Sequence, residues 1–459
     1  MTPFGWASIA RLGLVQMALG AIVVLTTSTL NRIMVVELAL PALLPGVLVA
    51  LHYAVQLARP RMGFGSDVGG RRTPWIVGGM LVLASGGVLA AVATVWMASH
   101  PAAGAVLALA AFAMVGLGVS AAGTSLLVLL AKRVPEGRRA GAATLVWMMM
   151  IAGFALTAGL AGHWLDPYSP TRLILVSSGV SLLALLLALV ALRGLEGNVT
   201  SGGARDPATQ EKPRFRQALA QVWSEPVARR FTIFVFVSML AYSAQDLILE
   251  PFAGTVFGYT PGESTQLSGL QHGGVLAGML LVAMAGAIGA RCRHHVLLRH
   301  VGSLRGWTIG GCLASALALL ALMFAGLQGT GWPLNATVFA LGVANGAFSI
   351  GAIGSMMRLA AEGRRAREGV RMGLWGAAQA VAFGLGGLVG TGASDLARWL
   401  ITSPGVAYAM VFALQALAFL LSAVLAWRLA APAARAGSAT SFQHAGESFA
   451  AGTSPRPQS

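Results

Sequence analysis

Charged side chains are scarce in this chain of 459 residues: Asp, Glu, Lys and Arg make up only 10% of it, whereas 56% is hydrophobic. A soluble domain contains about 25% charged residues, so too few are present here to cover a surface that faces water. The mean hydropathy of +0.74 agrees with this shortage. The composition therefore excludes a soluble globular protein and predicts a polytopic membrane protein that meets the lipid bilayer.

Acidic residues and cysteines are fewer still. The chain has 15 Asp and Glu against 31 Lys and Arg, a net charge of +16, which by itself suggests a nucleic-acid partner. The basic residues lie in short loops between apolar segments, however, so we expect no nucleic-acid binding. Two cysteines, Cys292 and Cys312, provide neither a disulfide framework nor the spacing of a metal site. We therefore predict no metal centre.

Long apolar stretches without strand-like alternation predict an all-α integral membrane fold, because only helices and closed barrels satisfy their backbone in lipid. A spanning helix needs about 20 mainly apolar residues. Twelve stretches meet this requirement, and each is predicted to be a transmembrane helix. Their predicted limits are 12–30, 38–58, 75–98, 103–131, 141–164, 172–193, 231–250, 268–290, 305–327, 333–358, 370–393 and 404–428.

The positions of the basic residues support twelve spans. With the N-terminus in the cytoplasm, 28 of the 31 Lys and Arg residues fall on the cytoplasmic side, and only Arg32, Arg172 and Arg398 fall on the other. This asymmetry is the positive-inside pattern. One missed or invented helix would scramble it, so we predict that the N- and C-termini are both cytoplasmic.

An internal repeat divides the chain. LGV at 117–119 precedes EGRRA at 136–140, and LGV at 341–343 precedes EGRRA at 362–366. The charged residues of the two pentads are Glu136, Arg138, Arg139, Glu362, Arg364 and Arg365. Two parallel six-helix pseudo-repeats are the architecture of the major facilitator superfamily. We predict an N-terminal half at 1–193, a cytoplasmic linker at 194–230, a C-terminal half at 231–430 and a disordered cytoplasmic tail at 431–459.

The loop GFGSDVGGRR at 63–72 resembles a pattern of the same superfamily, G-x-x-x-D-(R/K)-x-G-(R/K)-(R/K). Its matching residues are Gly63, Asp67, Gly70, Arg71 and Arg72, whereas Val68 replaces a basic residue. The corresponding loop of the second half, GARCRHH, has no acid. Two interpretations remain open: a tight structural turn at the membrane face, or one side of a charge contact that changes during transport.

Polar residues inside predicted spans are expensive in lipid and are therefore functional candidates. Tyr242, Asp246 and Glu250 follow one another at intervals of four, which places them on one helix face. Asp246 either lines a cavity or makes an ordinary interhelical hydrogen bond, and Glu250, just before Pro251, is expected at the outer water boundary. Arg32 and Glu37 are expected to form an ion pair at the outer end of the first two helices.

Four long segments have a closer resemblance. They are RLGLVQMALGAIVVLTTSTLNRIMVVELALPALLPG at 11–46, LHYAVQLARPRMGFGSDVGGRRTPWIVGGM at 51–80, DLILEPFAGTVFGYTPGESTQLSGLQHGGVLAGM at 246–279 and AREGVRMGLWGAAQAVAFGLGG at 366–387. In this order they resemble the PucC/LhaA family of purple phototrophic bacteria, a divergent branch of the major facilitator superfamily.

The resemblance implies a light-harvesting complex assembly factor in the bacterial inner (intracytoplasmic photosynthetic) membrane. Such a protein delivers bacteriochlorophyll to the antenna α/β polypeptides, acts as a chaperone for them, or does both, and self-association is compatible with it. The expected cargo is bacteriochlorophyll. An enzymatic role is not expected, because prenyl transfer needs clustered magnesium-binding aspartates. The alternative is a proton-coupled small-molecule transporter, porphyrin-like or other, as the fold alone suggests.

Two histidines in predicted spans are candidates for holding this cargo. His52 and His272 can each offer a neutral imidazole to the magnesium of a chlorin, although a lone membrane histidine is also commonly a hydrogen-bonded packing residue. Gln56, Gln245 and Gln271 are candidate hydrogen-bond partners of the pigment.

Overall fold

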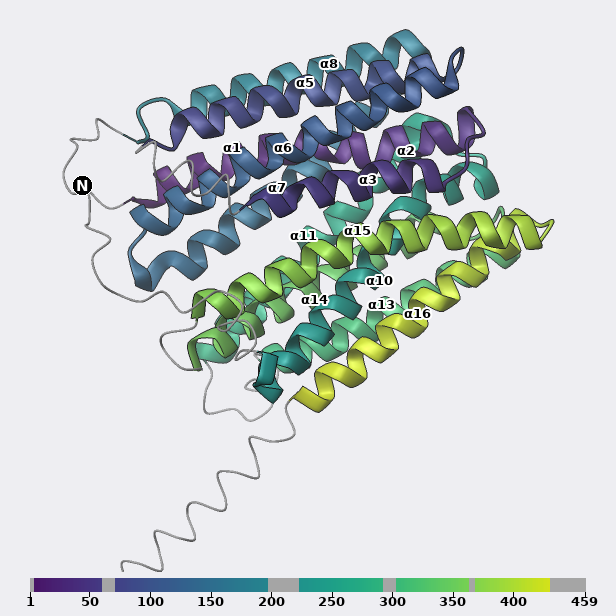
Figure 1. Cartoon of the computed structure of the whole chain (residues 1–459). Helices are drawn as coiled ribbons and strands as arrows, with labels where there is room; N and C mark the ends of the chain where they lie inside the picture. The colour runs from purple at the N-terminus through teal and green to yellow at the C-terminus, as the bar shows by residue number, and fades with distance from the viewer. Residues whose placement is uncertain (1–3, 60–70, 197–222, 292–302, 363–367, 430–459) are drawn as a thin grey trace, which may run out of the picture.

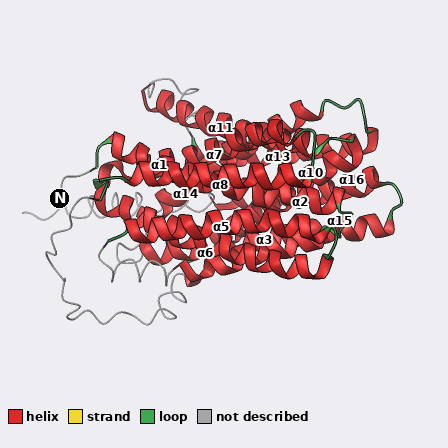
Figure 2. Ribbon diagram, turned by 90° about the horizontal axis from the view of Figure 1, so that it is seen from above, coloured by secondary structure: helices red, strands yellow, loops and turns green. Residues whose placement is uncertain are grey.

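The computed structural model describes residues 4–59, 71–196, 223–291, 303–362 and 368–429. Helices joined by short loops make up these ranges, and no strand occurs within them (Figure 2). Eleven of the described helices are long and apolar enough to cross a membrane, and a twelfth apolar helix, Leu43–Ala58, is shorter. The predicted all-α membrane fold with two six-helix halves is confirmed.

The two halves lie one above the other in Figure 1. The first helix of the N-terminal half comprises α1 (Trp6–Val24), a π-helical segment (Leu25–Thr29), α2 (Leu30–Arg32) and a second π-helical segment (Ile33–Glu37). It is followed by α3 (Leu43–Val55, extended by a 3₁₀ turn at Gln56–Ala58), α5 (Thr73–Met97), α6 (Pro101–Arg133), α7 (Glu136–Leu165) and α8 (Pro170–Leu192). The C-terminal half consists of α10 (Pro226–Phe257), α11 (Pro261–Arg291), α13 (Leu304–Gln328), α14 (Leu334–Glu362), α15 (Glu368–Leu400) and α16 (Pro404–Leu429).

The first two helices differ from the sequence prediction. The first helix does not end at residue 30 but continues through its π-helical turns to Glu37, so Arg32 lies inside a helix rather than in an outer loop. The second span consequently begins at Leu43 instead of residue 38. Its described part, to Ala58, is about 24 Å long, less than the roughly 30 Å of the hydrocarbon core.

Several other helices begin earlier than their apolar stretches. Proline stands at or next to the first position of α6, α8, α10, α11 and α16, where its missing N–H costs nothing. α10 therefore starts at Pro226, and it ends at Phe257, where Gly258 adopts a left-handed conformation with φ of +71°. Pro251 lies inside this helix. Glu250 is thus an interior residue, and the prediction of a water boundary at this position is wrong.

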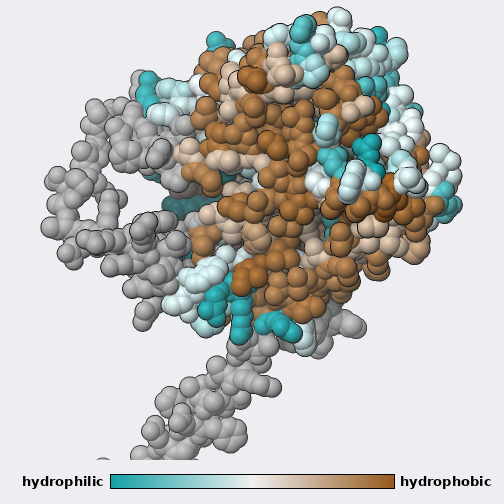
Figure 3. All heavy atoms as spheres, turned by 45° about the vertical axis from the view of Figure 1, so that its right-hand side comes forward, coloured by the Kyte–Doolittle hydropathy of each residue, from teal (hydrophilic) through white to brown (hydrophobic). Residues whose placement is uncertain are grey.

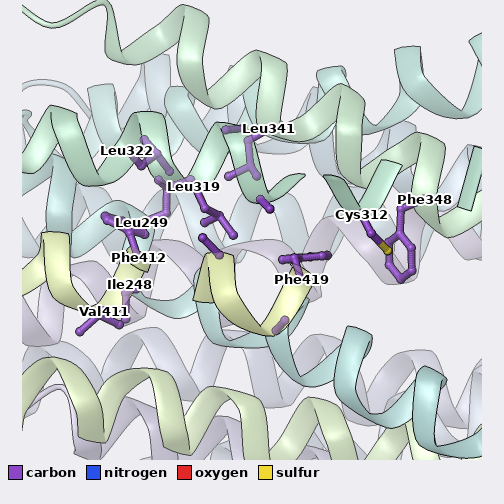
Figure 4. Close-up of a cluster of buried hydrophobic side chains, with 14 of the residues drawn as sticks. Ile248, Leu249, Cys312, Leu319, Leu322, Leu341, Phe348, Val411, Phe412 and Phe419 are labelled. Carbon is purple, nitrogen blue, oxygen red and sulfur yellow. The ribbon is translucent and has the colours of Figure 1, made fainter. Parts of the chain in front are cut away.

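Each half has its own apolar core. In the C-terminal half α10, α13, α14 and α16 contribute side chains such as Leu249, Leu319, Phe348 and Phe412 (Figure 4). In the N-terminal half α1, α5, α6 and α8 pack together. A small apolar cluster between α7 and α11, which includes Ile151 and Val275, joins the two halves near mid-membrane.

The outer surface of the helices is apolar over the middle of the view in Figure 3, whereas paler and hydrophilic residues gather along its upper and right-hand edges. Exposed tryptophans stand close to the helix ends: Trp6 and Trp427 on the side of the N-terminus, Trp96 and Trp399 on the opposite side. Tryptophan favours the two membrane–water interfaces. The positions of these four residues indicate that the helices span the bilayer along their length.

Candidate functional site

Most of the polar residues selected from the sequence lie where the two halves meet. α3 packs against α15 and α7 packs against α11, and the π-helical part of the first helix contacts α10 and α11. A side chain that points from these helices into the interface is enclosed by protein rather than by lipid. The arrangement provides a water-poor environment in which polar groups interact strongly.

His52 on α3 is engaged with its own helix. Its side chain is buried, and its Nε2 lies 2.7 Å from Nε2 of Gln56, one turn further on. The Gln56 carbonyl oxygen accepts a hydrogen bond from Arg59, which leaves the amide N–H to donate to His52. Nε2 of His52 therefore uses its lone pair within the protein. The remaining ring nitrogen, Nδ1, is buried and has no hydrogen-bond partner in the described part of the chain.

His272 on α11 has the opposite arrangement. The structure places it eleven residues into the helix, not near its start as the sequence predicted. Its Nδ1 lies 2.8 Å from the carbonyl oxygen of Ser268, to which it can only donate a proton. Its ring meets the edge of Phe154 from α7, with the ring centres 5.0 Å apart. This hydrogen bond fixes the tautomer in which Nε2 keeps a free lone pair.

Asp246 lies in a small polar and aromatic cluster at the same interface. Its Oδ1 accepts a hydrogen bond of 3.3 Å from Gln271 on α11. Tyr53 of α3 and Tyr242 of α10 both contact Phe383 of α15, with ring centres 5.3 and 5.9 Å from that of Phe383. The cluster thus combines Tyr242 and Asp246, which the sequence placed on one helix face, with Gln271 and two further aromatic residues.

Two other candidates lie outside this cluster. Gln245 is fully buried, and neither atom of its amide has a hydrogen-bond partner among the described residues. Glu250 is buried as well, and its carboxylate faces Arg32 together with the hydroxyl groups of Ser28 and Ser268. Neither side chain joins Asp246 and Gln271.

The outer end of the interface is held by polar contacts between the halves. Asn31 donates to the carbonyl oxygen of Leu247 at 2.5 Å, and Arg32 donates both to Glu37 and to the carbonyl oxygen of Tyr259, the latter at 2.5 Å. The predicted ion pair of Arg32 with Glu37 is confirmed. Hydroxyl pairs add two further contacts, Ser28 with Ser268 at 3.3 Å and Thr29 with Thr265 at 3.1 Å. The two π-helical segments direct these residues of the first helix toward the C-terminal half.

The loop motif is described only at its end. Gly63, Asp67 and Gly70 lie outside the described residues, Arg71 is exposed, and Arg72 precedes α5. The carboxylate of Glu196 accepts hydrogen bonds from the backbone N–H groups of Arg72 and Thr73, at 2.7 and 2.8 Å, and from the Thr73 hydroxyl at 2.6 Å. Burial of the Glu196 carboxyl opposes its ionisation, but these hydrogen bonds and the charge of Arg72 together hold its pKa below the usual 4.5.

The repeated pentads follow corresponding helices, α6 in the first half and α14 in the second, but their first residues have different places. Glu136 is the first residue of α7, and Arg139 donates to the carbonyl oxygen of Val134 at 3.1 Å, whereas Arg138 is exposed. In the second half Glu362 is the last residue of α14, and Arg364 and Arg365 lie outside the described residues.

Three residues escaped the sequence analysis: Tyr53 and Asn31 at the interface, and Glu196 at the start of α5 within the N-terminal half. Tyr53 and Asn31 are uncharged polar residues inside apolar segments, and they would be found by counting hydrogen-bonding groups rather than charges in spans. Glu196 gives no local signal, because its partners lie more than a hundred residues earlier in the chain.

The architecture and the polar interface between the halves define a membrane protein with the major facilitator fold. The solved structure of a bacterial homologue of the human drug peptide transporters is similar, with a TM-score of 0.66 and 14% sequence identity over 92% of this chain and 97% of that one.

The family is narrower than the fold. A family profile described as "PUCC protein" matches residues 29–434, and the chain therefore belongs to this family. A relative from Rhodobacter capsulatus named "Bacteriochlorophyll synthase 44.5 kDa chain" is 52% identical, covering 92% of this chain and 95% of the relative. A second relative from that organism, named "Protein PucC", is 30% identical, covering 91% and 90%.

Proposed function

We propose that this protein is a light-harvesting antenna assembly factor of purple phototrophic bacteria. In this role it binds bacteriochlorophyll as cargo and passes it to the antenna α/β polypeptides, or shelters these polypeptides until they assemble, in the inner photosynthetic membrane. Membership of the PUCC protein family supports a role in photosynthetic complexes. One relative is named as a bacteriochlorophyll synthase chain. We nevertheless propose a non-enzymatic role for this chain, because the candidate residues favour holding a pigment over converting it.

The geometry of His272 is the observation that favours pigment binding. A histidine that binds a metal typically donates its other ring N–H to a carbonyl or carboxylate group, and His272 makes this contact with Ser268. Its Nε2 is then available for the magnesium of a chlorin, which takes one axial nitrogen. The neighbouring apolar side chains of Phe154, Ile151 and Val275 suit a hydrophobic macrocycle.

His52 is the weaker of the two histidine candidates. To bind a magnesium ion through Nε2 it would have to give up its contact with Gln56, which is in turn held by Arg59. Gln271 remains a candidate for hydrogen bonding to a pigment carbonyl group, since it stands next to His272 and its amide already reaches Asp246.

Pigment retention tests this proposal. The unmodified protein and the variants His272→Ala and His52→Ala are purified in mild detergent from a host that makes bacteriochlorophyll, and the pigment is measured by near-infrared absorption. Loss of the axial ligand is expected to lower retained pigment roughly tenfold in His272→Ala, with little change in His52→Ala. Equal retention by all three proteins would exclude His272 as the ligand, and absence of pigment from the unmodified protein would exclude pigment binding.

A transporter remains the second candidate because of the Asp246 cluster. A partly exposed carboxylate that lies between the halves beside Gln271, Tyr53 and Tyr242 is a suitable group for proton-coupled transport. This function predicts proton-driven accumulation of a solute, such as a porphyrin, in proteoliposomes, and its loss in Asp246→Asn. Glu263→Gln, which alters an exposed carboxylate at the outer end, is the matched control.

A further inference from the structure

The two helices α3 and α15, which join the halves on one side, separate toward the end of the molecule at which α1 begins. Near the opposite end they are in close contact, because a Cβ on Gly46 of α3 would lie 2.2 Å from the hydroxyl oxygen of Thr391 on α15. Seven residues further along both helices, about 10 Å, a Cβ on Gly384 would meet Tyr53 at an ordinary contact distance of 3.5 Å. At this level side chains, not backbones, fill the space between α3 and α15.

The second pair of joining helices, α7 and α11, behaves in the same way. A Cβ on Gly269 of α11 would lie 2.7 Å from the amide nitrogen of Gly159 on α7. One turn further along α11, a Cβ on Gly273 would meet nothing within 4 Å. Both pairs thus lose their backbone contact in the same direction, in agreement with the divergence of the two halves in Figure 1.

A group of aromatic residues and one carboxyl group lies at the level where this separation begins. Tyr53, Tyr242, Asp246 and Phe383 are each half-buried, whereas Gln245, the neighbour of Asp246 in the chain, is fully buried. The two tyrosine rings are tilted by 42° and 55° against the ring of Phe383, so the three rings do not cover one another's faces. The carboxyl group of Asp246 interacts electrostatically with the hydroxyl groups of both tyrosines.

Asp246 has no cationic partner in the described part of the chain. Its Oδ1 accepts a hydrogen bond of 3.3 Å from Gln271, which is a neutral amide, and no salt bridge between described residues includes it. Arg59, the cation that acts on Tyr53, lies six residues further along the chain and donates to Gln56. An acid inside a membrane bundle usually pairs with another polar or charged group. Asp246 therefore offers a negative charge that these residues leave uncompensated.

Aromatic rings next to a carboxylate form the kind of site that recognises a cation. The negative potential over a ring face attracts a positive charge, and this attraction grows where water is excluded. A cation beside a carboxyl group in turn favours its ionised form. A neutral pigment makes no use of such a charge, which separates this cluster from the histidine proposed to hold bacteriochlorophyll.

We propose that Tyr53, Tyr242, Asp246 and Phe383 bind a lipophilic organic cation of the tertiary or quaternary ammonium class, which enters between the two halves. The carboxylate of Asp246 pairs with the positive charge, and the rings contact the apolar groups around it. Gln271 holds the carboxylate from α11, so the ligand touches residues of both halves. The proposal goes beyond antenna assembly, and for the transport candidate it names the class of solute.

Two ions of similar shape and opposite charge test the site. Tetraphenylphosphonium and tetraphenylborate are offered in equilibrium dialysis to full-length protein, purified in detergent from a host that makes no bacteriochlorophyll. We expect the unmodified protein to bind the phosphonium cation saturably and to show no saturable binding of the borate anion. Equal affinity for the two ions, or no saturable binding of the cation, would overturn the proposal.

Substitutions separate the contribution of the charge from that of the rings. Asp246→Asn keeps the shape of the side chain and is expected to weaken binding of tetraphenylphosphonium about thirtyfold or more, whereas Glu263→Gln, at an exposed carboxylate, leaves it unchanged. Tyr242→Leu is expected to weaken binding about fivefold, and Tyr242→Phe, which keeps the ring, to leave it nearly intact. Full binding by Asp246→Asn, or equal affinities of the two Tyr242 variants, would refute the site. Because these samples contain no pigment, the outcome is independent of pigment retention by His272.

Discussion

The two halves use glycine at corresponding helix pairs, but they distribute the closest contacts differently. In the N-terminal half the glycines of α5 and α6 bring these two helices into backbone contact. In the C-terminal half the shortest glycine contacts described lie between α11 and α14, where a Cβ on Gly342 would lie 2.2 Å from the carbonyl oxygen of Gln271. α13 also meets α14, where a Cβ on Gly311 would lie 2.6 Å from the amide nitrogen of Phe348, and an apolar groove remains beside this contact.

The comparison shows that a repeated motif does not imply a repeated contact. Gly118 and Gly342 occupy the same place in the two LGV segments, but Gly118 packs against α5 and Gly342 packs against α11. A small residue permits a close approach without selecting the neighbour. The remaining side chains of each half determine which helix becomes the neighbour.

The largest expected effect contrasts a tightly packed glycine of the N-terminal half with an open one of the C-terminal half. Gly118→Leu forces a side chain against the backbone of α5. We expect the free energy of unfolding to fall by more than about 3 kcal/mol, which is enough to prevent the folded protein from accumulating. Gly310→Leu, in the corresponding helix pair, is expected to fold normally. Thermal unfolding in detergent measures the stability of each variant, and the yield of monodisperse protein measures how much of it folds. Equal stability of the two variants would show that the close contact at Gly118 does not require a glycine.

A smaller effect is expected at the contacts that join the halves. Arg32→Met removes the bonds to Glu37 and Tyr259 and leaves Glu250 buried without its facing cation. Because Glu37 is one-third exposed, we expect about 2–3 kcal/mol rather than the full cost of breaking a buried pair. Arg398→Met, which changes an exposed arginine at the same end, should cost less than about 0.5 kcal/mol. If the two variants unfold at the same temperature, the contacts of Arg32 with Glu37 and Tyr259 do not stabilise the protein.

The smallest effect concerns the end of the N-terminal half at which α5 begins. The pKa of Glu196 is lowered in the folded protein, so its stabilisation is present above about pH 4.5 and is lost as the pH falls through the folded pKa. Glu196→Gln should therefore cost about 1 kcal/mol at pH 7 and progressively less under acid conditions. Unfolding curves of both proteins between pH 7 and pH 4 measure the difference. If the difference in unfolding free energy between the two proteins stays constant across this range, the ionised carboxylate of Glu196 is not its cause.

The fold was predictable from the sequence because charge and hydropathy are summed over whole spans. The ends of the helices were harder to predict. The count of apolar residues took no account of Pro226 and Pro261, at which α10 and α11 begin several residues before their apolar stretches. The π-helical turns that carry the first helix to Glu37 also gave no signal in composition.

The candidate site was predictable in its residue types but not in its pairings. Asp246 and Gln271 were both selected, and their hydrogen bond was not foreseen, because it joins two helices whose relative rotation depends on packing. His52 and His272 appeared equivalent in the sequence. Only the hydrogen-bond partners of the two rings distinguish them: the carbonyl oxygen of Ser268 accepts from His272, and the amide of Gln56 donates to His52.

The central claim is a role in antenna assembly, and deletion of the gene tests it most directly. The whole-cell near-infrared absorption spectrum of the deletion strain is compared with those of the parent and of the strain complemented with the unmodified gene. The proposed function predicts selective loss of an antenna absorption band, restored by complementation, while the cells still make bacteriochlorophyll. An unchanged spectrum, with every antenna band at its parental intensity, would contradict the role in assembly.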